Sequence, residues 1–182
     1  MDALDAWLKQ GVRPETAGAV FDHLPASPVE ALQGTWDGAG LPSGHPLDGL
    51  LEYHGWRGKR FRDPDTVDPL LFRHGFGTLS VAAARIPYSL ILRPPRLARA
   101  AAARQAVAVL LPLLSTHRPG ARLRLAQWGS KVSAAMIYDG LPIIDHFRWV
   151  DQNRVMGLMD YRDMPAPFFF LLTRAPEIRD AG

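Results

Sequence analysis

The run Gly-Thr-Trp-Asp-Gly-Ala-Gly at residues 34–40 limits what this chain can fold into more than any other feature of its sequence. Glycine has no Cβ, so another part of the chain can come close to the backbone on either side of the tryptophan. The Trp36 indole brings a large apolar area to the same place. The run therefore predicts the first strand of a small β-barrel, with Trp36 as an aromatic plug that closes one end.

Strand-like segments with short links follow this run. The later half of the chain shows the pattern most clearly, with tight turns at Asp139-Gly140 and at residues 151–153. Successive antiparallel strands with short links form a meander that can close on itself. We expect about eight strands in the ring. The candidate strands are residues 35–38, 50–53, 56–61, 70–73, 78–82, 123–128, 132–138, 142–150, 154–160 and 168–173.

Helices are predicted at two places. Residues 2–10 and 14–24 carry apolar side chains at helical spacing, and we expect these short helices to close one mouth of the barrel, with Trp7 and Phe21 packed inward. The second place is an inserted helix at residues 94–114, which is basic at its start and apolar later. Three roles are open for it: packing or capping, a lid, and weak contact with a membrane surface.

Composition favours one soluble-type domain that spans residues 1–182. A chain of 182 residues with 47% hydrophobic and 21% charged residues can bury a core. It has no cysteine, which excludes disulfides, a thiolate nucleophile and cysteine-ligated metals. The N-terminus is acidic and has no apolar core of signal-peptide length, so we expect a cytoplasmic location.

Positive charge is concentrated in the middle of the chain. Residues 69–138 contain no Asp or Glu but many arginines. Such a segment can meet nucleic acid, anionic lipid or an acidic partner, or it can form an outer face whose counter-charges lie elsewhere in the fold. The sequence has no helix-turn-helix, ribonucleoprotein or zinc-finger pattern, so a nucleic-acid partner is not expected.

Strand alternation points to Asp145 as the main candidate for chemistry. Side chains two apart in a strand share a face, which places Asp145 with Ile143, Phe147 and Trp149. A carboxyl group in an apolar cup has a raised pKa and can act as a general acid or base. The alternative is a structural role, in which Asp145 accepts hydrogen bonds from an arginine or from a backbone turn.

His146 follows Asp145 and has three interpretations. It is an exposed strand residue, a partner of a carboxylate, or an axial haem ligand. No two histidines have the short spacing of a metal site, and the sequence lacks His-Glu-x-x-His. No metal site is therefore expected.

Two blocks of sequence together carry a family resemblance. The first includes the run at 34–40 and Gly-Trp-Arg-Gly-Lys-Arg-Phe at 55–61, and the second includes Met-Ile-Tyr-Asp-Gly-Leu-Pro-Ile-Ile-Asp-His-Phe-Arg at 136–148. They resemble the bacterial family in which a GXWXG block, here residues 32–72, precedes a DUF4334 block, here residues 122–173. The activity of this family is largely unassigned, so the resemblance implies a fold and little chemistry.

The opening run is also similar to the start of calycins, which include the haem-binding nitrobindins. That likeness implies a calycin-like antiparallel β-barrel. With the helices predicted above, the expected fold is a mainly β, calycin-like barrel with short N-terminal helices and one inserted helix. The likeness also implies haem as an alternative cofactor, held by His146. Otherwise no cofactor is expected.

Two tryptophans depart from the family pattern. Trp128 and its neighbour Gln127 lie in a stretch that usually carries charges, and Trp149 stands at a position that is usually basic. If the two indoles face inward, they suit an extended apolar molecule or a positively charged transition state. If they face outward, they are surface changes.

These features predict a pocket that binds a small hydrophobic molecule, such as a lipid, polyketide or terpenoid. The alternative is a cyclase or isomerase that acts on such a molecule through its shape and one acid or base. In that case Asp145 is the catalytic residue, with Tyr138 or His146 assisting. The residues expected to line the pocket are Trp36, Tyr53, Trp56, Tyr138, Asp145, Phe147, Trp149, Met156 and Phe170.

Overall fold

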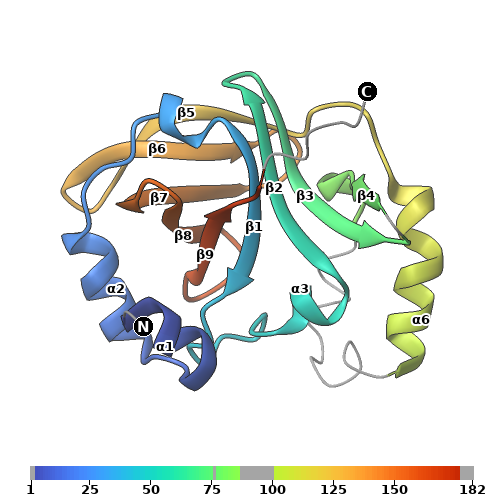
Figure 1. The fold of residues 1–182 in the computed structure, drawn as a ribbon, viewed down its shortest axis with the longest axis horizontal. Coiled ribbons are helices and arrows are strands. Elements are labelled where there is room, and N and C mark those ends of the chain that lie inside the picture. The colour runs from blue at the N-terminus through green and yellow to red at the C-terminus, as the bar shows by residue number, and fades with distance from the viewer. Residues whose placement is uncertain (1–2, 76, 87–100, 177–182) are drawn as a thin grey trace.

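A computed structural model of the chain describes residues 3–75, 77–86 and 101–176 (Figure 1). The described residues form nine β-strands in one antiparallel sheet. The strands are β1 (Gly34–Gly40), β2 (Trp56–Asp63), β3 (Thr66–His74), β4 (Gly77–Ser80), β5 (Ala121–Trp128), β6 (Lys131–Tyr138), β7 (Ile143–Asp151), β8 (Arg154–Tyr161) and β9 (Phe168–Arg174).

Eight of these strands close into a ring. The order in the sheet is β2-β1-β9-β8-β7-β6-β5-β3-β4, and β2 also pairs with β3. The sheet therefore returns to its first strand, while β4 continues outward from β3. The β3–β5 seam is narrow, because Val67 and Ala121 are its one pair in register. The expected mainly β, antiparallel barrel is confirmed.

Because neighbouring strands run in opposite directions, the ring has two distinct ends. At the first, which we call the Trp36 end, β1 begins and β9 ends. At the second, the Tyr138 end, β6 ends and β5 begins. Ser27 N–H donates to Ser133 Oγ at 2.8 Å, and Trp149 N–H donates to the Pro25 carbonyl at 2.9 Å. These bonds tie the segment before β1 to the strands near the Trp36 end.

Trp36 is fully buried, as a plug must be. Its indole N–H donates to the Leu32 carbonyl at 2.7 Å, so the buried polar atom is satisfied. The Arg174 guanidinium lies 4.3 Å from the centre of the indole ring. Leu32 belongs to the short 3-10 helix η1 (Glu30–Leu32), and Trp36 therefore joins this segment to the barrel core.

The glycines around Trp36 allow a close approach, but the group that approaches is a second indole. A Cβ at Gly38 would lie 2.3 Å from Cη2 of Trp56. Gly38 therefore leaves room for the Trp56 ring to lie against β1 inside the barrel. The sequence predicted that these glycines make room for another part of the backbone. At Gly38 they instead make room for a side chain.

A bulge in β2 decides which of its residues face inward. Gly58 has φ +147°, and the β2–β3 register shifts on both sides of it. A Cβ at this position would lie 2.0 Å from the Trp36 carbonyl oxygen, so only glycine fits. In a regular strand, residues three apart face opposite sides. Because of the extra residue, Trp56 and Lys59 both face the interior.

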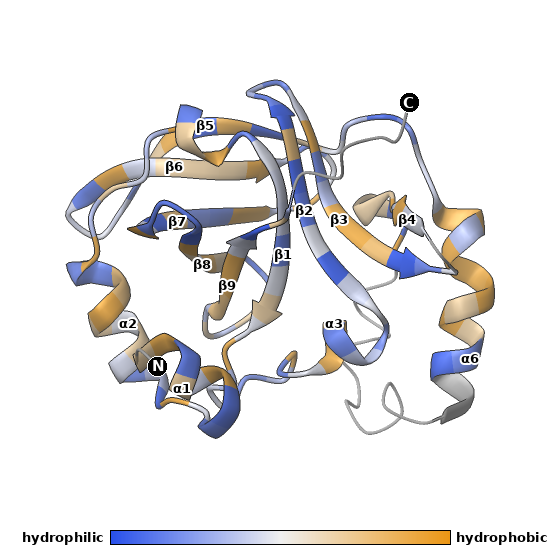
Figure 2. Ribbon diagram, in the orientation of Figure 1, coloured by the Kyte–Doolittle hydropathy of each residue, from blue (hydrophilic) through white to orange (hydrophobic). Residues whose placement is uncertain are grey.

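The N-terminal helices α1 (Ala3–Gln10) and α2 (Pro14–His23) cover the outside of the sheet instead of closing its mouth. Phe21 lies 6.3 Å from the ring of Phe169, in a cluster separate from the barrel core. Both helices carry hydrophobic and hydrophilic residues (Figure 2). The expectation that Trp7 and Phe21 pack into the barrel is therefore wrong, because the outward-facing residues of β8 and β9 are also apolar and need cover.

Residues 50–53 also differ from their prediction. They form the short helix α3 (Leu50–Tyr53) instead of a strand. The carboxylate of Asp48 accepts the N–H groups of Ser43, Gly44 and His45, which folds the preceding loop back on itself. A helical turn follows and is closed by the Tyr53 N–H bond to the Gly49 carbonyl.

The predicted helix at 94–114 is described in its second part. It forms α6 (Ala101–Leu110) and the 3-10 helix η3 (Leu111–Leu114), whereas residues 94–100 lie outside the described residues. Leu111 is buried in the barrel core, which we also call the main core, and Val109 is 71% exposed. In the described ranges, no helix has the length and apolar character needed to cross a membrane.

Candidate functional site

A buried ion pair lies inside the barrel. Lys59 Nζ of β2 is 2.8 Å from Oδ2 of Asp145 of β7. The two side chains are 3% and 1% exposed. β2 is a largely hydrophilic strand beside the apolar part of β3 (Figure 2), and the Gly58 bulge turns one of its charges inward. Burying two charges costs free energy that their attraction offsets only when further hydrogen bonds are made.

Tyr138 joins this pair into a network of three groups. Lys59 Nζ donates to the Tyr138 hydroxyl at 3.3 Å and to the Pro69 carbonyl at 3.2 Å. The Tyr138 hydroxyl lies 3.5 Å from Oδ2 of Asp145 and donates to it. Two of the three catalytic residues expected from the sequence, Asp145 and Tyr138, are therefore brought together.

Aromatic rings surround the Lys59 ammonium group. Its nitrogen lies 5.9, 5.6 and 5.2 Å from the ring centres of Trp56, Tyr138 and Phe170. These distances are in the range of cation–π attraction, which is stronger when the cation is desolvated. These three rings stabilise the positive charge of Lys59 in a place that water does not reach.

Asp145 has the electrostatic setting of a general acid or base. Burial raises the pKa of the Asp145 carboxyl above its ordinary value, and the attraction and hydrogen bond of Lys59 and the bond from Tyr138 oppose that rise. Its second oxygen, Oδ1, has no hydrogen-bond partner among the described residues. A buried carboxyl group with a raised pKa is one that can act as a general acid or base.

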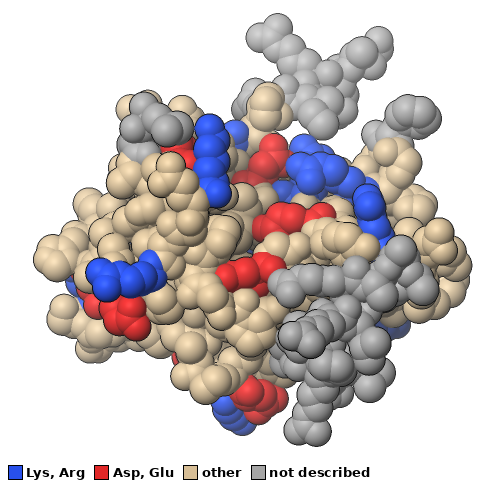
Figure 3. Space-filling view, turned by 90° about the horizontal axis from the view of Figure 1, so that it is seen from below, with Lys and Arg blue, Asp and Glu red and all other residues tan. Residues whose placement is uncertain are grey.

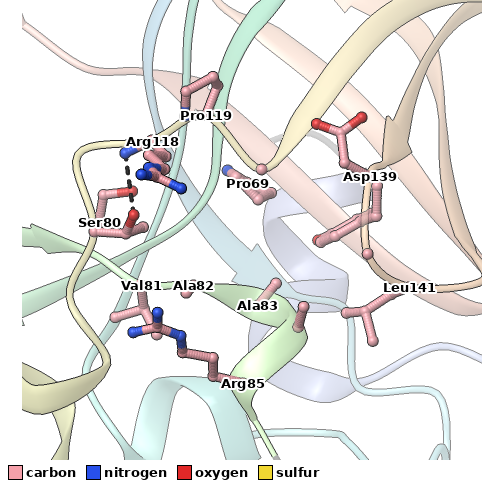
Figure 4. A pocket seen from close by; sticks show the side chains of 15 residues that line it. Pro69, Ser80, Val81, Ala82, Ala83, Arg85, Arg118, Pro119, Asp139 and Leu141 are labelled. Carbon is pink, nitrogen blue, oxygen red and sulfur yellow. Dashed lines mark hydrogen bonds between the residues drawn. The ribbon is translucent and has the colours of Figure 1, made fainter.

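A pocket of about 290 Å³ opens at the Tyr138 end (Figure 4). Two of its lining residues, Tyr138 and Pro69, also contact Lys59, so the pocket adjoins the buried network. Its lining comes from the middle of β3, from the end of β4 and the residues after it, from the chain before β5, and from the end of β6 and the turn after it. The lining residues are Pro69, Ser80, Val81, Ala82, Ala83, Ala84, Arg85, Thr116, Arg118, Pro119, Gly120, Tyr138, Asp139, Gly140 and Leu141.

Four of the aromatic residues expected to line a pocket fill the barrel interior. Trp36, Trp56, Phe147 and Phe170 are all buried in the main core. The Phe170 ring lies 6.3 Å from that of Trp56 and 6.2 Å from that of Phe147, edge to face in both cases. Trp56, Phe147 and Phe170 thus pack against one another, and none of the four residues lines the pocket at the Tyr138 end.

The other three expected lining residues are dispersed. Tyr53 is half-buried on α3, where the Arg104 guanidinium lies 5.4 Å from its ring centre. Trp149 is half-buried and packs against the main core. Met156 is fully buried, but in the outer cluster under α1 and α2. The inward orientation expected for Met156 is therefore wrong, because its place in β8 faces the helices.

His146 does not join Asp145. It is buried on the opposite face of β7, with its ring 5.1 Å from that of Trp128. Burial lowers the pKa of His146, with Asp160 acting to raise it and Arg148 to lower it further. The expectation that His146 assists Asp145 is corrected, because adjacent strand residues point to opposite faces. For the same reason, His146 does not fit an axial ligand of a haem inside the barrel.

Within residues 3–75, 77–86 and 101–176, no three His, Asp or Glu side chains are placed to hold a metal ion together.

Two arginines of the carboxylate-free segment have counter-charges from outside it. Arg122 pairs with Asp139 at 2.8 Å, and Arg124 pairs with Asp65 at 2.6 Å. On the face seen in Figure 3, basic and acidic residues lie beside one another. For these two arginines, the interpretation as an outer face with counter-charges elsewhere is confirmed.

Lys59 is the residue of the site that the sequence did not single out. If side chains alternated regularly along β2 from an inward-facing Trp56, Lys59 would lie on the outer face of the strand. The available signal was Gly58, since a glycine within a strand pattern often marks a bulge. A bulge at that point reverses the alternation and makes Lys59 an interior residue.

Comparisons with known proteins agree with the two blocks. A family model described as GXWXG protein matches residues 19–77, and one described as domain of unknown function (DUF4334) matches residues 119–174. The crystal structure of a protein from Thermomonospora curvata is 34% identical, over 91% of this chain and 90% of that chain, with a TM-score of 0.68. A search of curated proteins finds no match.

Proposed function

The chain belongs to the family in which a GXWXG block precedes a DUF4334 block, and we propose that its barrel binds one small, mainly hydrophobic molecule at the Tyr138 end. One observation carries this proposal. The pocket at this end shares Tyr138 with the buried Lys59–Asp145 pair, so a bound molecule would lie directly above a polar network.

The size and lining of the pocket support a compact ligand. Its volume of about 290 Å³ is close to the lower end of the range for small-molecule sites, about 300–1,000 Å³. Much of the lining is small and apolar, with Val81, Ala83 and Leu141 among its members. The aromatic interior is already packed around Lys59, so we place the ligand at the mouth. A short lipid, or a terpenoid or polyketide of similar size, fits this description.

Filling the pocket should block binding. We expect Ala82→Phe to weaken the binding of 1-octanol at least about tenfold, because the new ring would occupy space that the ligand needs. The measurement is displacement of the neutral fluorescent probe N-phenyl-1-naphthylamine by 1-octanol. Val132→Phe is the control, since Val132 is 53% exposed on β6 and does not line the pocket.

Thermal unfolding of both variants shows whether the barrel is intact. If folded Ala82→Phe binds the probe and 1-octanol as tightly as the parent protein, the ligand does not occupy this pocket. If 1-octanol and the probe do not bind the parent protein, the binding function itself is refuted.

The second candidate function is an isomerase or cyclase that needs no cofactor. Tyr138 favours it, because one side chain both lines the pocket and hydrogen-bonds to Asp145. In this scheme Asp145 accepts a proton from the ligand through the Tyr138 hydroxyl and returns it to another ligand atom. The protein and its charge are unchanged at the end of the cycle. Lys59 stabilises the negative charge of Asp145 before the first transfer and after the second, when the carboxyl group is deprotonated.

Removing either proton-carrying group should stop such a reaction. We expect Asp145→Asn and Tyr138→Phe each to lower turnover at least about 100-fold while ligand affinity stays within about tenfold. Native mass spectrometry of the protein from its own host identifies a retained ligand, and chromatography follows its conversion. His74→Gln is the control, because His74 is exposed at the end of β3. Full turnover in either Asp145→Asn or Tyr138→Phe would remove that residue from the reaction.

A further inference from the structure

Two arginines stand at the opening of the pocket. Arg85 ends the 3-10 helix η2 (Ala83–Arg85), and Arg118 lies in the loop that leads into β5. Both side chains are exposed, and neither forms an ion pair or a side-chain hydrogen bond with another described residue. In Figure 4 they lie on the same side of the opening, with Asp139 across from them. The pocket therefore has two positive charges available for a ligand.

The acidic group on the rim is already engaged. Asp139 accepts a hydrogen bond from Arg122 Nε at 2.8 Å, so its charge is balanced by an arginine that does not line the pocket. Residues 69–138, which supply most of the lining, contain no Asp or Glu. The rim consequently carries a net positive charge, which attracts anions toward the opening.

The backbone around Arg118 is held in place. Its N–H donates to Thr116 Oγ1 at 3.0 Å, and the Thr116 N–H donates to the Ser80 carbonyl at 2.9 Å. The Arg118 side chain is therefore attached to an ordered turn beside β4. Arg85 starts from a short helix whose first residue, Ala83, is buried in the core.

We propose that the ligand of this pocket is an amphipathic carboxylic acid. Its carboxylate binds Arg85 and Arg118, and its apolar part lies against the small apolar side chains and reaches toward Tyr138. The planar guanidinium group can bind a carboxylate through two parallel hydrogen bonds, which suits this role better than lysine. This inference rests on the proposed binding function and adds the class of ligand and its orientation.

A matched acid and alcohol test the charge directly. Calorimetric titration at low salt should show octanoate binding at least about tenfold more tightly than 1-octanol, because only the acid can pair with the arginines. Arg85→Gln and Arg118→Gln should each reduce this preference, and the double variant should bind both molecules equally. Added salt should weaken the preference in the parent protein, since the rim is exposed.

Arg124→Gln is the matched control. Arg124 comes from the same carboxylate-free segment, but it pairs with Asp65 at 2.6 Å and does not line the pocket. It should leave the preference for octanoate unchanged, and unfolding curves should show that all four variants remain folded.

The outcomes separate this inference from the function on which it rests. Two results would contradict the proposal that the ligand is a carboxylic acid: equal binding of octanoate and 1-octanol by the parent protein, or a preference for octanoate that remains in the double arginine variant. Neither result would contradict the proposed binding of a hydrophobic molecule in this pocket. Failure of both molecules to bind would refute the pocket function itself.

Discussion

Replacing Lys59 with methionine is expected to lower the free energy of unfolding by about 3–5 kcal/mol at neutral pH. Methionine keeps most of the length of the side chain but removes the charge that faces Asp145 at 2.8 Å. The carboxylate would then remain in a site where it is 1% exposed, without its counter-charge. Urea unfolding measured by fluorescence gives the loss directly.

The loss should depend on pH. Burial already raises the pKa of Asp145, and Lys59 opposes the rise, so removing Lys59 should raise the folded-state pKa further above the unfolded value of about 3.9. The folded variant then binds the Asp145 proton more tightly than the unfolded chain. Its stability is therefore greatest below that unfolded value and falls as the pH rises toward the folded-state pKa. The difference from the parent protein should be smallest in acid and largest at neutral pH.

A double variant provides the control. Lys59→Met with Asp145→Leu replaces both charges with apolar groups, and we expect it to recover most of the lost stability. Its unfolding should also lose the pH dependence that Asp145 causes in the single variant. If Lys59→Met alone costs less than about 1 kcal/mol at neutral pH, the ion pair is not buried as described.

Trp36→Ala is expected to cost a similar amount, about 3–5 kcal/mol, because it removes one of the two largest fully buried side chains of the described residues and leaves a cavity. The variant would also lose the hydrogen bond to the Leu32 carbonyl and the contact with Arg174. Both contacts hold chain segments at the Trp36 end. The loss of unfolding free energy should therefore exceed the part that comes from the lost apolar contacts alone. The free energy of unfolding again measures the effect.

Two comparisons sharpen this second prediction. Trp7→Ala removes the same type of side chain from a half-buried position on α1 and should cost less. Trp36→Phe keeps an aromatic ring but leaves the Leu32 carbonyl without its donor, and should fall between the two. A loss below about 1 kcal/mol in Trp36→Ala would show that the indole is not the plug of this barrel.

The later strands were predictable because their alternation is regular and their turns are short. The sequence predicted residues 132–138 and 154–160 as strands, and β6 and β8 extend over nearly the same residues. Residues 50–53 were predicted wrongly as a strand, since the Asp48 side chain organises the loop before them into a helical turn. The outward packing of α1 and α2 was also missed, because an amphipathic helix can cover either a barrel mouth or an outer face.

The sequence by itself determined the family, the mainly β barrel, the burial of Trp36 and the inward orientation of Asp145. All of these depend on local patterns: two blocks of sequence for the family, strand-like segments with short links for the barrel, glycine spacing around one tryptophan, and a two-residue period along one strand. These patterns can be read along the chain and do not need the rest of the fold.

Only the tertiary structure decided the composition of the site. Lys59 faces Asp145 because the Gly58 bulge reverses the alternation of β2 and because ring closure brings β2 and β7 across one interior. The pocket joins residues 69, 80–85, 116, 118–120 and 138–141, which come from four separate parts of the chain and meet at the Tyr138 end. Contacts between such distant segments follow from strand register and barrel closure, and no local pattern in the sequence encodes them.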